Sequence, residues 1–268
     1  MKLKRFIKDL VSDVLFSCNR GKWERLNKGD FRILLYHSVE KRDTSVDTMG
    51  LAISPELFYA QMKYLKEKGA NILSLPDLIA GIINGLPIPD KAVAITFDDG
   101  YKSVFTGALP ILKEFGFTAA VFINIYFVEN KIANSLYYHD WSALSWKEVK
   151  QLYGAGLSIG SHALTHGKLA KLSDQEINYE VKQSKILIED NTGIKINTFS
   201  YPHGSFNRRI KNIVRDSGFI CSCSSIEGIN NTKADFYALK RTEISAFDNS
   251  LARFEKKVSG SYDWLGYI

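Results

Sequence analysis

The chain has 268 residues, 45% of them hydrophobic, so it is long enough to bury a substantial core without disulfide or metal staples. Its net charge of +6 is moderate, and its basic residues are not interleaved with aromatic side chains along a groove-forming motif, which argues against nucleic-acid binding. The cysteines, Cys18, Cys221 and Cys223, form a sparse, odd set without metal-ligand spacing, and we expect them to be reduced packing residues.

Much of the positive charge lies in the first thirty residues. Residues 1–16 combine basic and apolar side chains in the pattern of a short amphipathic helix. Lys8, Asp9 and Asp13 interrupt the apolar stretch that a secretory signal needs, and no later segment has the length of a membrane span. We therefore expect a cytoplasmic protein whose first helix either lies on an anionic membrane surface or docks on its own domain.

The next stretch, residues 32–37, is a predicted strand that ends in a titratable side chain, His37. A histidine in this place can carry chemistry or simply close the core. The following residues predict a polar loop over 41–51, a helix from Ser54 to Gly69, a strand over 71–75 and a helix over 76–83. This alternation of strand and helix favours a parallel sheet with helices outside.

An apolar, β-branched run over residues 92–97 predicts a buried strand that stops at Asp98, Asp99 and Gly100. Adjacent carboxylates repel each other unless a bound cation offsets their charge or one of them carries a proton. Neighbours on an extended chain point in different directions, so one carboxylate can face a metal while the other faces a substrate. Asp-Asp-Gly is also an ordinary turn sequence after a strand, so the aspartate pair alone does not distinguish a functional site from a turn.

After the aspartate pair we expect a helix over residues 103–115, in which Pro110 marks either a kink or a new first turn, then a strand over 118–125. The stretch 130–141 is rich in Tyr, Asn and His. Its aromatic side chains suit either the C–H faces of sugar rings or packing of the loop on the domain, and His139 receives no role.

A second polar strand end follows about sixty residues after the first. A predicted helix over 145–152 leads to a strand over 157–161, which ends at His162, and His166 lies four residues further on. If the chain is helical here, this spacing puts both imidazoles on one face. Together with a carboxylate of the aspartate pair they would give two nitrogen ligands and one oxygen ligand, leaving positions open for water and substrate.

The motifs Thr-Phe-Asp-Asp-Gly over residues 96–100 and Ser-His-x-x-x-His over residues 161–166 resemble the polysaccharide deacetylases of carbohydrate esterase family 4, the NodB homology domain. The similarity covers about residues 31–244. It implies an α/β fold, a distorted and partly open (β/α)7-type barrel with its site at the C-terminal ends of the strands. The implied organisation is an N-terminal extension over residues 1–30 and a catalytic domain over 31–268.

The resemblance also implies roles for the residues of both motifs. Asp98 would be the general base, and Asp99, His162 and His166 would bind one divalent metal ion, with Zn²⁺ expected and Co²⁺, Ni²⁺ or Fe²⁺ as alternatives. Family members usually carry a Leu-x-His motif near the C-terminus that supplies the general acid. Here Leu35-Tyr36-His37 supplies that pattern at the front of the chain, as in the circularly permuted branch typified by poly-N-acetylglucosamine deacetylases.

A third polar strand end follows a long predicted helix over residues 173–192, which carries no obvious chemistry. At Pro202-His203-Gly204 the family has a turn whose backbone N–H stabilises the oxyanion, and the N–H of His203 would take this role. Two roles stay open for the His203 side chain: it helps to bind substrate, or it competes with the expected ligands for the metal. Many relatives carry an arginine before this proline; Arg241, at the end of the last strand, is either its substitute or a surface residue.

The expected activity is hydrolysis of N-acetyl groups on an amino-sugar glycan, which releases acetate and a free amine. His37 would protonate the departing amine, because an amine leaves badly as an anion. A sugar O-acetyl esterase and a catalytically silent glycan-binding relative are the alternatives. The partner is an N-acetylated glycan, with membrane or lipid-linked contact left open and the oligomeric state undetermined.

Overall fold

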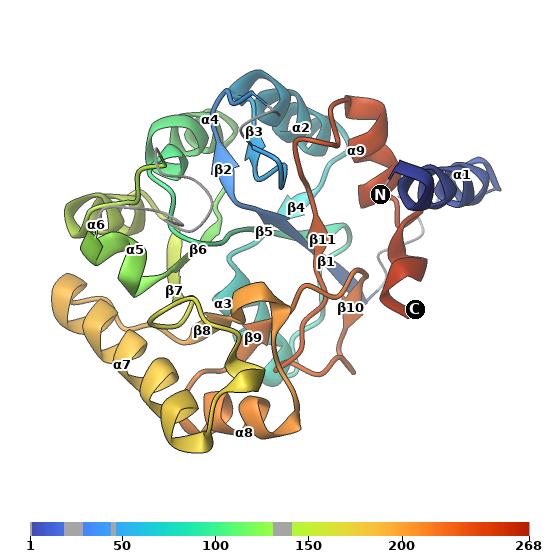
Figure 1. The fold of residues 1–268 in the computed structure, drawn as a ribbon. Helices are drawn as coiled ribbons and strands as arrows, with labels where there is room; N and C mark the ends of the chain where they lie inside the picture. Colours follow the sequence, from blue (N-terminus) through green and yellow to red (C-terminus); the bar gives the residue numbers. More distant parts are fainter. Residues whose placement is uncertain (1, 19–28, 44–46, 131–140, 268) are drawn as a thin grey trace.

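A computed structural model describes residues 2–18, 29–43, 47–130 and 141–267, with strands at the centre and helices around them (Figure 1). The strands are β1 (Asp30–Tyr36), β2 (Ser38–Val39), β3 (Ala52–Ile53), β4 (Asn71–Ile72), β5 (Ala92–Phe97), β6 (Ala120–Ile123), β7 (Ser158–Ser161), β8 (Thr198–Ser200), β9 (Cys221–Cys223), β10 (Asn230–Asn231) and β11 (Thr242–Glu243). The α-helices are α1 (Lys2–Cys18), α2 (Pro55–Glu67), α3 (Leu75–Ile83), α4 (Leu109–Phe115), α5 (Ile125–Asn130), α6 (Trp146–Gly154), α7 (Asp174–Thr192), α8 (Arg208–Asp216) and α9 (Leu251–Val258). Shorter helical turns are η1 (Val104–Ala108), η2 (Leu169–Lys171), η3 (Pro202–Gly204) and η4 (Asp263–Tyr267).

The main sheet of the described residues runs in the order β10-β1-β5-β6-β7-β8-β9, with β4 beside β5 and β11 beside β1. All of its pairings are parallel except that of β10 with β1. Leu239 bridges to Cys223 of β9 just before β11 joins β1, so the two sides of the sheet approach each other. The sheet curls into a partly open barrel, which confirms the predicted fold.

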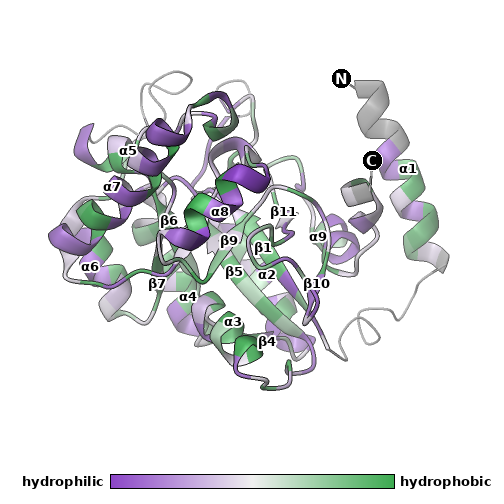
Figure 2. Cartoon of the chain, turned by 90° about the horizontal axis from the view of Figure 1, so that it is seen from below, coloured by the Kyte–Doolittle hydropathy of each residue, from purple (hydrophilic) through white to green (hydrophobic). Residues whose placement is uncertain are grey.

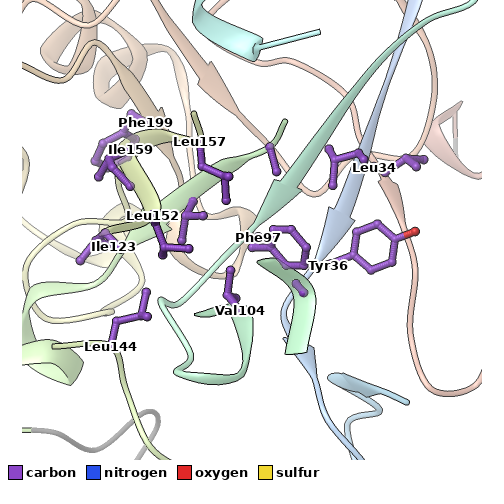
Figure 3. Packing of buried hydrophobic residues seen from close by; sticks show 14 of the residues in the cluster. Leu34, Tyr36, Phe97, Val104, Ile123, Leu144, Leu152, Leu157, Ile159 and Phe199 are labelled. Carbon is purple, nitrogen blue, oxygen red and sulfur yellow. The ribbon is translucent and has the colours of Figure 1, made fainter. Parts of the chain in front are cut away.

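The two central strands are buried over almost their whole length. Six of the seven residues of β1 and all six of β5 are buried, as expected for parallel strands covered on both faces. The rings of Tyr36 on β1 and Phe97 on β5 lie side by side (Figure 3), with centroids 5.6 Å apart. Phe58 of α2 meets the Tyr36 ring edge-on, with centroids 5.2 Å apart. In Figure 2 the central strands are mostly in the hydrophobic colour, whereas helices such as α7 and α8 alternate hydrophilic and hydrophobic residues.

Local signals fix the ends of several helices as predicted. The Ser54 hydroxyl accepts the backbone N–H of Leu57 at 3.2 Å at the start of α2. In α7 the side chains and backbones of Ser173 and Glu176 form a reciprocal capping box. The two cysteines whose side chains are described, Cys221 and Cys223, are buried and unbridged, in agreement with the expectation.

Two predicted elements differ from the structure. The helix expected over 103–115 divides into the π-helical turn η1 and the helix α4. Pro110 lies in the first turn of α4, so the second alternative for this proline is the observed one. Gly107 of η1 lies against β2, where a Cβ atom would come within 2.1 Å of the carbonyl oxygen of Val39. The strand expected through residue 125 ends at Ile123, because Asn124 starts α5 by accepting the N–H of Phe127 at 3.2 Å.

The N-terminal helix α1 lies beside α9 and the C-terminal turn η4 (Figures 1 and 2). Asp9 pairs with Arg253 and accepts the Tyr262 hydroxyl at 3.0 Å, and Ser12 accepts the indole N–H of Trp264 at 3.2 Å. Docking on the chain's own domain, one of the two alternatives for this helix, is therefore observed. The division of the chain near residue 30 stays a prediction. Among the described helices, none combines the length and the apolar composition needed to cross a membrane.

Candidate active site

The polar strand ends converge on one pocket of about 260 Å³. Its lining includes predicted site residues from the C-terminal ends of β1, β5, β7 and β8: His37, Asp98, Asp99, His162, His166 and His203. The remaining predicted residue, Arg241, lies buried behind Asp98. Parallel strands place their C-terminal ends at one edge, which explains how positions so distant in sequence meet.

Asp99 lies between the two imidazoles of the second motif. Its Oδ1 atom is 3.3 Å from Nε2 of His162 and 3.0 Å from Nε2 of His166. Two ligands held about 2.0–2.1 Å from one tetrahedral ion lie about 3.3–3.4 Å apart, which is close to this spacing. Among the described residues, these three side chains form the group whose donor atoms are mutually near enough to hold a metal ion.

A backbone contact prepares His162 for such a role. Its Nδ1 atom lies 2.8 Å from the carbonyl oxygen of Ser200, which can only accept a hydrogen bond. Nδ1 therefore carries the hydrogen, and in the neutral ring Nε2 presents its lone pair towards Asp99. Carbonyl-oriented imidazoles of this kind are typical of metal sites, so the donor set fits a divalent ion.

The charges of the cluster complement each other. Burial opposes ionisation of Asp99, but the charge of His166 and hydrogen bonds from both imidazoles outweigh it and hold the pKa of Asp99 well below its ordinary value. Burial would lower the pKa of His162, because it disfavours the charged ring. The carboxylates of Asp98 and Asp99 outweigh burial, so the pKa of His162 lies above its ordinary value. The site thus favours a carboxylate with positive charge beside it.

The two histidines do not lie on a helix, so that conditional expectation is wrong. Residues 162–168 form an irregular turn, in which Ala163 and His166 adopt positive φ angles of 60° and 62°. Glu180 of α7 holds this turn, because its Oε2 atom accepts the backbone N–H groups of Leu164 and Thr165 at 2.9 Å each. The turn brings both imidazoles to Asp99, which itself has a φ of 73°.

Asp98 is held by a buried arginine. Nη1 of Arg241 donates to Oδ1 of Asp98 at 2.8 Å, and Nη2 donates to Oδ2 at 2.7 Å. The Ser200 hydroxyl adds a bond to Oδ2 at 3.0 Å, and the Arg241 Nε–H donates to the carbonyl oxygen of Ser224 at 2.8 Å. Arg241 is 1% exposed, so the alternative of a surface arginine is wrong.

These contacts determine the protonation of Asp98. Burial would raise its pKa, but the charges of Arg241 and then His162 outweigh burial and lower the pKa. The carboxylate is therefore ionised near neutral pH. Its Oδ1 atom accepts only one of the observed hydrogen bonds, which leaves a lone pair for a further proton or donor.

The remaining predicted residues lie at the rim of the pocket. His37 follows β1 and is partly exposed. Nε2 of His203 donates to the carbonyl oxygen of His166 at 3.1 Å, and the two rings lie 4.6 Å apart. The His203 ring is therefore turned to the backbone of the histidine turn and lies outside the three-residue donor group. Burial and the charge of His166 lower the pKa of His203.

Sequence reasoning missed two residues that organise this pocket. Ser200 bonds Asp98 through its hydroxyl and His162 through its carbonyl, and its place at a strand end beside Tyr201-Pro202 was the available signal. Glu180 is 6% exposed on α7, a helix to which no chemistry was assigned. Its signal was a carboxylate on the buried face between Ile177 and Val181. Residues 131–140 of the aromatic stretch, which include His139, lie outside the described residues. Trp141 at its end is buried and packs on Tyr101 with ring centroids 4.6 Å apart.

Comparisons with known proteins identify relatives of this chain. A sequence model of the family described as polysaccharide deacetylase matches residues 86–221, about half of the chain. YxkH of Bacillus subtilis strain 168, whose name refers to the same family, is 27% identical over 80% of this chain and 71% of its own. A Staphylococcus epidermidis protein named poly-beta-1,6-N-acetyl-D-glucosamine N-deacetylase is 25% identical over 86% of this chain and 85% of its own.

A solved structure shows the same fold. The Streptococcus pyogenes deacetylase PplD, determined in complex with acetate, superposes with a TM-score of 0.76 at 23% identity. The superposition covers 85% of this chain and 98% of PplD. The curled sheet with helices around it is thus the shared architecture.

Proposed function

Because this chain belongs to the polysaccharide deacetylase family, we propose that it is a metal-dependent hydrolase that removes N-acetyl groups from an amino-sugar glycan and releases acetate. The observation that carries the proposal is the meeting, in one pocket, of the Asp99, His162 and His166 group with the arginine-held carboxylate of Asp98. The name of the staphylococcal relative supports a poly-N-acetylglucosamine as the substrate class.

Asp99, His162 and His166 would hold the metal, with Zn²⁺ as the proposed ion and Co²⁺, Ni²⁺ or Fe²⁺ as alternatives. Two imidazoles and a carboxylate suit each of these ions and leave positions for water and substrate. A bound divalent ion polarises the acetamide carbonyl and lowers the pKa of a coordinated water.

Asp98 is the proposed general base. Arg241 keeps its carboxylate ionised, and the open lone pair of Oδ1 accepts the proton of the attacking water. The low pKa that Arg241 imposes makes Asp98 a weak base, which is sufficient for a water already acidified at the site. Arg241 is therefore a positioning residue that acts through Asp98.

His37 is the proposed general acid, and the backbone N–H of His203 the proposed donor to the oxyanion. A protonated His37 gives its proton to the departing amine, since an amide nitrogen is a poor leaving group as an anion. The N–H of His203 does not depend on its side chain, so the histidine in place of the usual aromatic residue preserves this donor.

Acetate release separates the candidate reactions. The wild-type protein, loaded with Zn²⁺ or Co²⁺, should release acetate from N-acetylglucosamine oligosaccharides, and Asp98→Asn should lose nearly all of this turnover. Release from O-acetylated sugars alone would replace the amidase by an esterase. Release from neither substrate would identify a silent relative.

We also propose that α1 can contact an anionic membrane or a lipid-linked glycan. Leu10 and Val14 are 54% and 56% exposed on this helix, on which basic residues cluster near the N-terminus. Co-sedimentation with anionic vesicles, compared with Leu10→Ser, tests this contact; equal sedimentation of the two proteins would argue against it.

A further inference from the structure

A second pocket, of about 490 Å³, lies between α1, β11, α9 and η4, and we call it the tail pocket. Its lining combines the apolar side chains of Phe247 and Leu265 with the carboxylates of Glu227 and Glu243. All of its lining residues lie outside residues 86–221, the span matched by the family. Its volume lies within the range of small-molecule sites, about 300–1,000 Å³, whereas the catalytic pocket is smaller than that range.

The tail pocket adjoins the catalytic pocket. Glu243 lines both of them, and it sits beside Leu35 of the catalytic pocket in the pairing of β11 with β1. The ring of Phe247 packs on Gly50, where an added Cβ atom would come within 2.7 Å of it, and the neighbouring Met49 lines the catalytic pocket. The two pockets are thus neighbours, and a chain-like ligand that passes Glu243 would reach both of them.

Lys8 of α1 lines the tail pocket as an exposed basic side chain, and the other charged groups of the pocket fall into two sets. Asp248 binds Nε of Arg253 at 2.9 Å and Nζ of Lys257 at 2.7 Å, and Asp9 also pairs with Arg253, so these carboxylates are satisfied. Glu227 and Glu243 make no side-chain hydrogen bond or ion pair with other described residues. The Oε1 atom of Glu227 is buried without any hydrogen-bond partner among them. A buried acceptor without a donor is costly, so the Glu227 end of the pocket favours a ligand that donates a hydrogen bond to this carboxyl group.

We propose that the tail pocket binds a sugar residue of the same glycan whose N-acetyl group is hydrolysed in the catalytic pocket. Pyranose rings present C–H faces that pack on apolar side chains such as Phe247, and their hydroxyls supply the donors that Glu227 and Glu243 lack. The lining carries the four carboxyl groups of Asp9, Glu227, Glu243 and Asp248 against the three basic side chains of Lys8, Arg253 and Lys257, of which Arg253 and Lys257 are already paired. This balance favours a neutral or amino sugar over a phosphate-bearing headgroup. This inference rests on the proposed deacetylation for the identity of the ligand.

The test compares substrates that do and do not reach the tail pocket. Acetate release is measured with N-acetylglucosamine and with its β-1,6-linked pentasaccharide, for the wild type, Phe247→Ala and Glu227→Gln. Each variant should lower kcat/KM for the pentasaccharide by at least about fivefold, or about 1 kcal/mol, and leave the monosaccharide rate unchanged. Matched controls are Tyr179→Ala, an exposed aromatic residue on α7, and Glu67→Gln on α2, both of which should behave as the wild type.

Equal kcat/KM ratios in the variants and the wild type would overturn the inference while leaving the deacetylase intact. A direct binding measurement separates the two proposals further. The pentasaccharide is titrated calorimetrically into Asp98→Asn with and without Phe247→Ala. Binding that weakens at least about fivefold with Phe247→Ala supports the tail pocket even if the wild type releases no acetate, and binding insensitive to this change refutes it.

Discussion

Replacement of Arg241 by methionine should destabilise the protein strongly, because it leaves the carboxylate of Asp98 buried without its counter-charge. Arg241 and Asp98 are 1% and 3% exposed, and two hydrogen bonds join them. Removing one partner of such a buried ion pair lowers the free energy of unfolding by about 3–5 kcal/mol. The methionine also loses the bond to the Ser224 carbonyl, which places the expected loss towards the upper part of that range.

Urea unfolding of the wild type, Arg241→Met, Asp98→Asn and the double variant measures this coupling. The double variant carries no charge on either side chain of this pair. Its loss of unfolding free energy should therefore be smaller than the sum of the losses of the two single variants. An Arg241→Met protein that unfolds within about 0.5 kcal/mol of the wild type would refute the view that this pair is buried and coupled.

The same pair controls the pH dependence of activity. Arg241 lowers the pKa of Asp98, and the base must be ionised, so protonation of Asp98 should lower kcat/KM on the acid side. Arg241→Lys keeps the charge but loses the planar two-bond contact, which raises the pKa of Asp98. Its acid limb should therefore lie at higher pH than that of the wild type; an unchanged limb would contradict the assignment of Asp98 as base.

Three further results are expected. His37→Ala should reduce acetate release from N-acetyl substrates at least about a hundredfold with metal content unchanged, and wild-type turnover would discard it as the acid. Burial raises the pKa of Glu227 from 4.5 to about 7, so the stability that its protonated form contributes is present below about pH 4.5 and lost as the pH rises through about 7. Glu227→Gln lacks this titration, so its free energy of unfolding in urea should rise relative to that of the wild type by up to about 3 kcal/mol between pH 4.5 and pH 8. Parallel pH curves for the two proteins would show that the pKa of Glu227 is not raised. Gly160→Ala would bring a Cβ atom within 2.6 Å of the Phe122 ring, and thermal unfolding should reveal a loss of about 1–3 kcal/mol, whereas an unchanged midpoint would show that the strands can separate.

Strand patterns and polar strand ends were the parts of this protein that sequence reasoning located well. Apart from Arg32 and Thr96, the runs over residues 31–36 and 92–97 that precede His37 and Asp98 are apolar, as burial on both faces of a parallel strand requires. Since parallel strands end at one edge, the pocket followed from the same pattern.

Features that depend on contacts between distant segments were harder to predict. The histidine turn is held by Glu180 from another element, and the spacing of His162 and His166 is equally compatible with a helix. Arg241 lies 143 positions after Asp98, and no local pattern distinguishes a buried arginine from a surface one. The tail pocket joins residues from both ends of the chain, so no single stretch of sequence reveals it.

The dependence of acetate release on one metal ion tests the central claim most directly. Metal content and acetate release from an N-acetylglucosamine oligosaccharide are measured before treatment with a chelator, after it, and after addition of Zn²⁺ or Co²⁺. We expect about one ion per chain, loss of both ion and activity on chelation, and recovery of both on reloading, with neither regained by His166→Ala. Acetate release at the full rate from protein shown by elemental analysis to be free of metal would contradict the account.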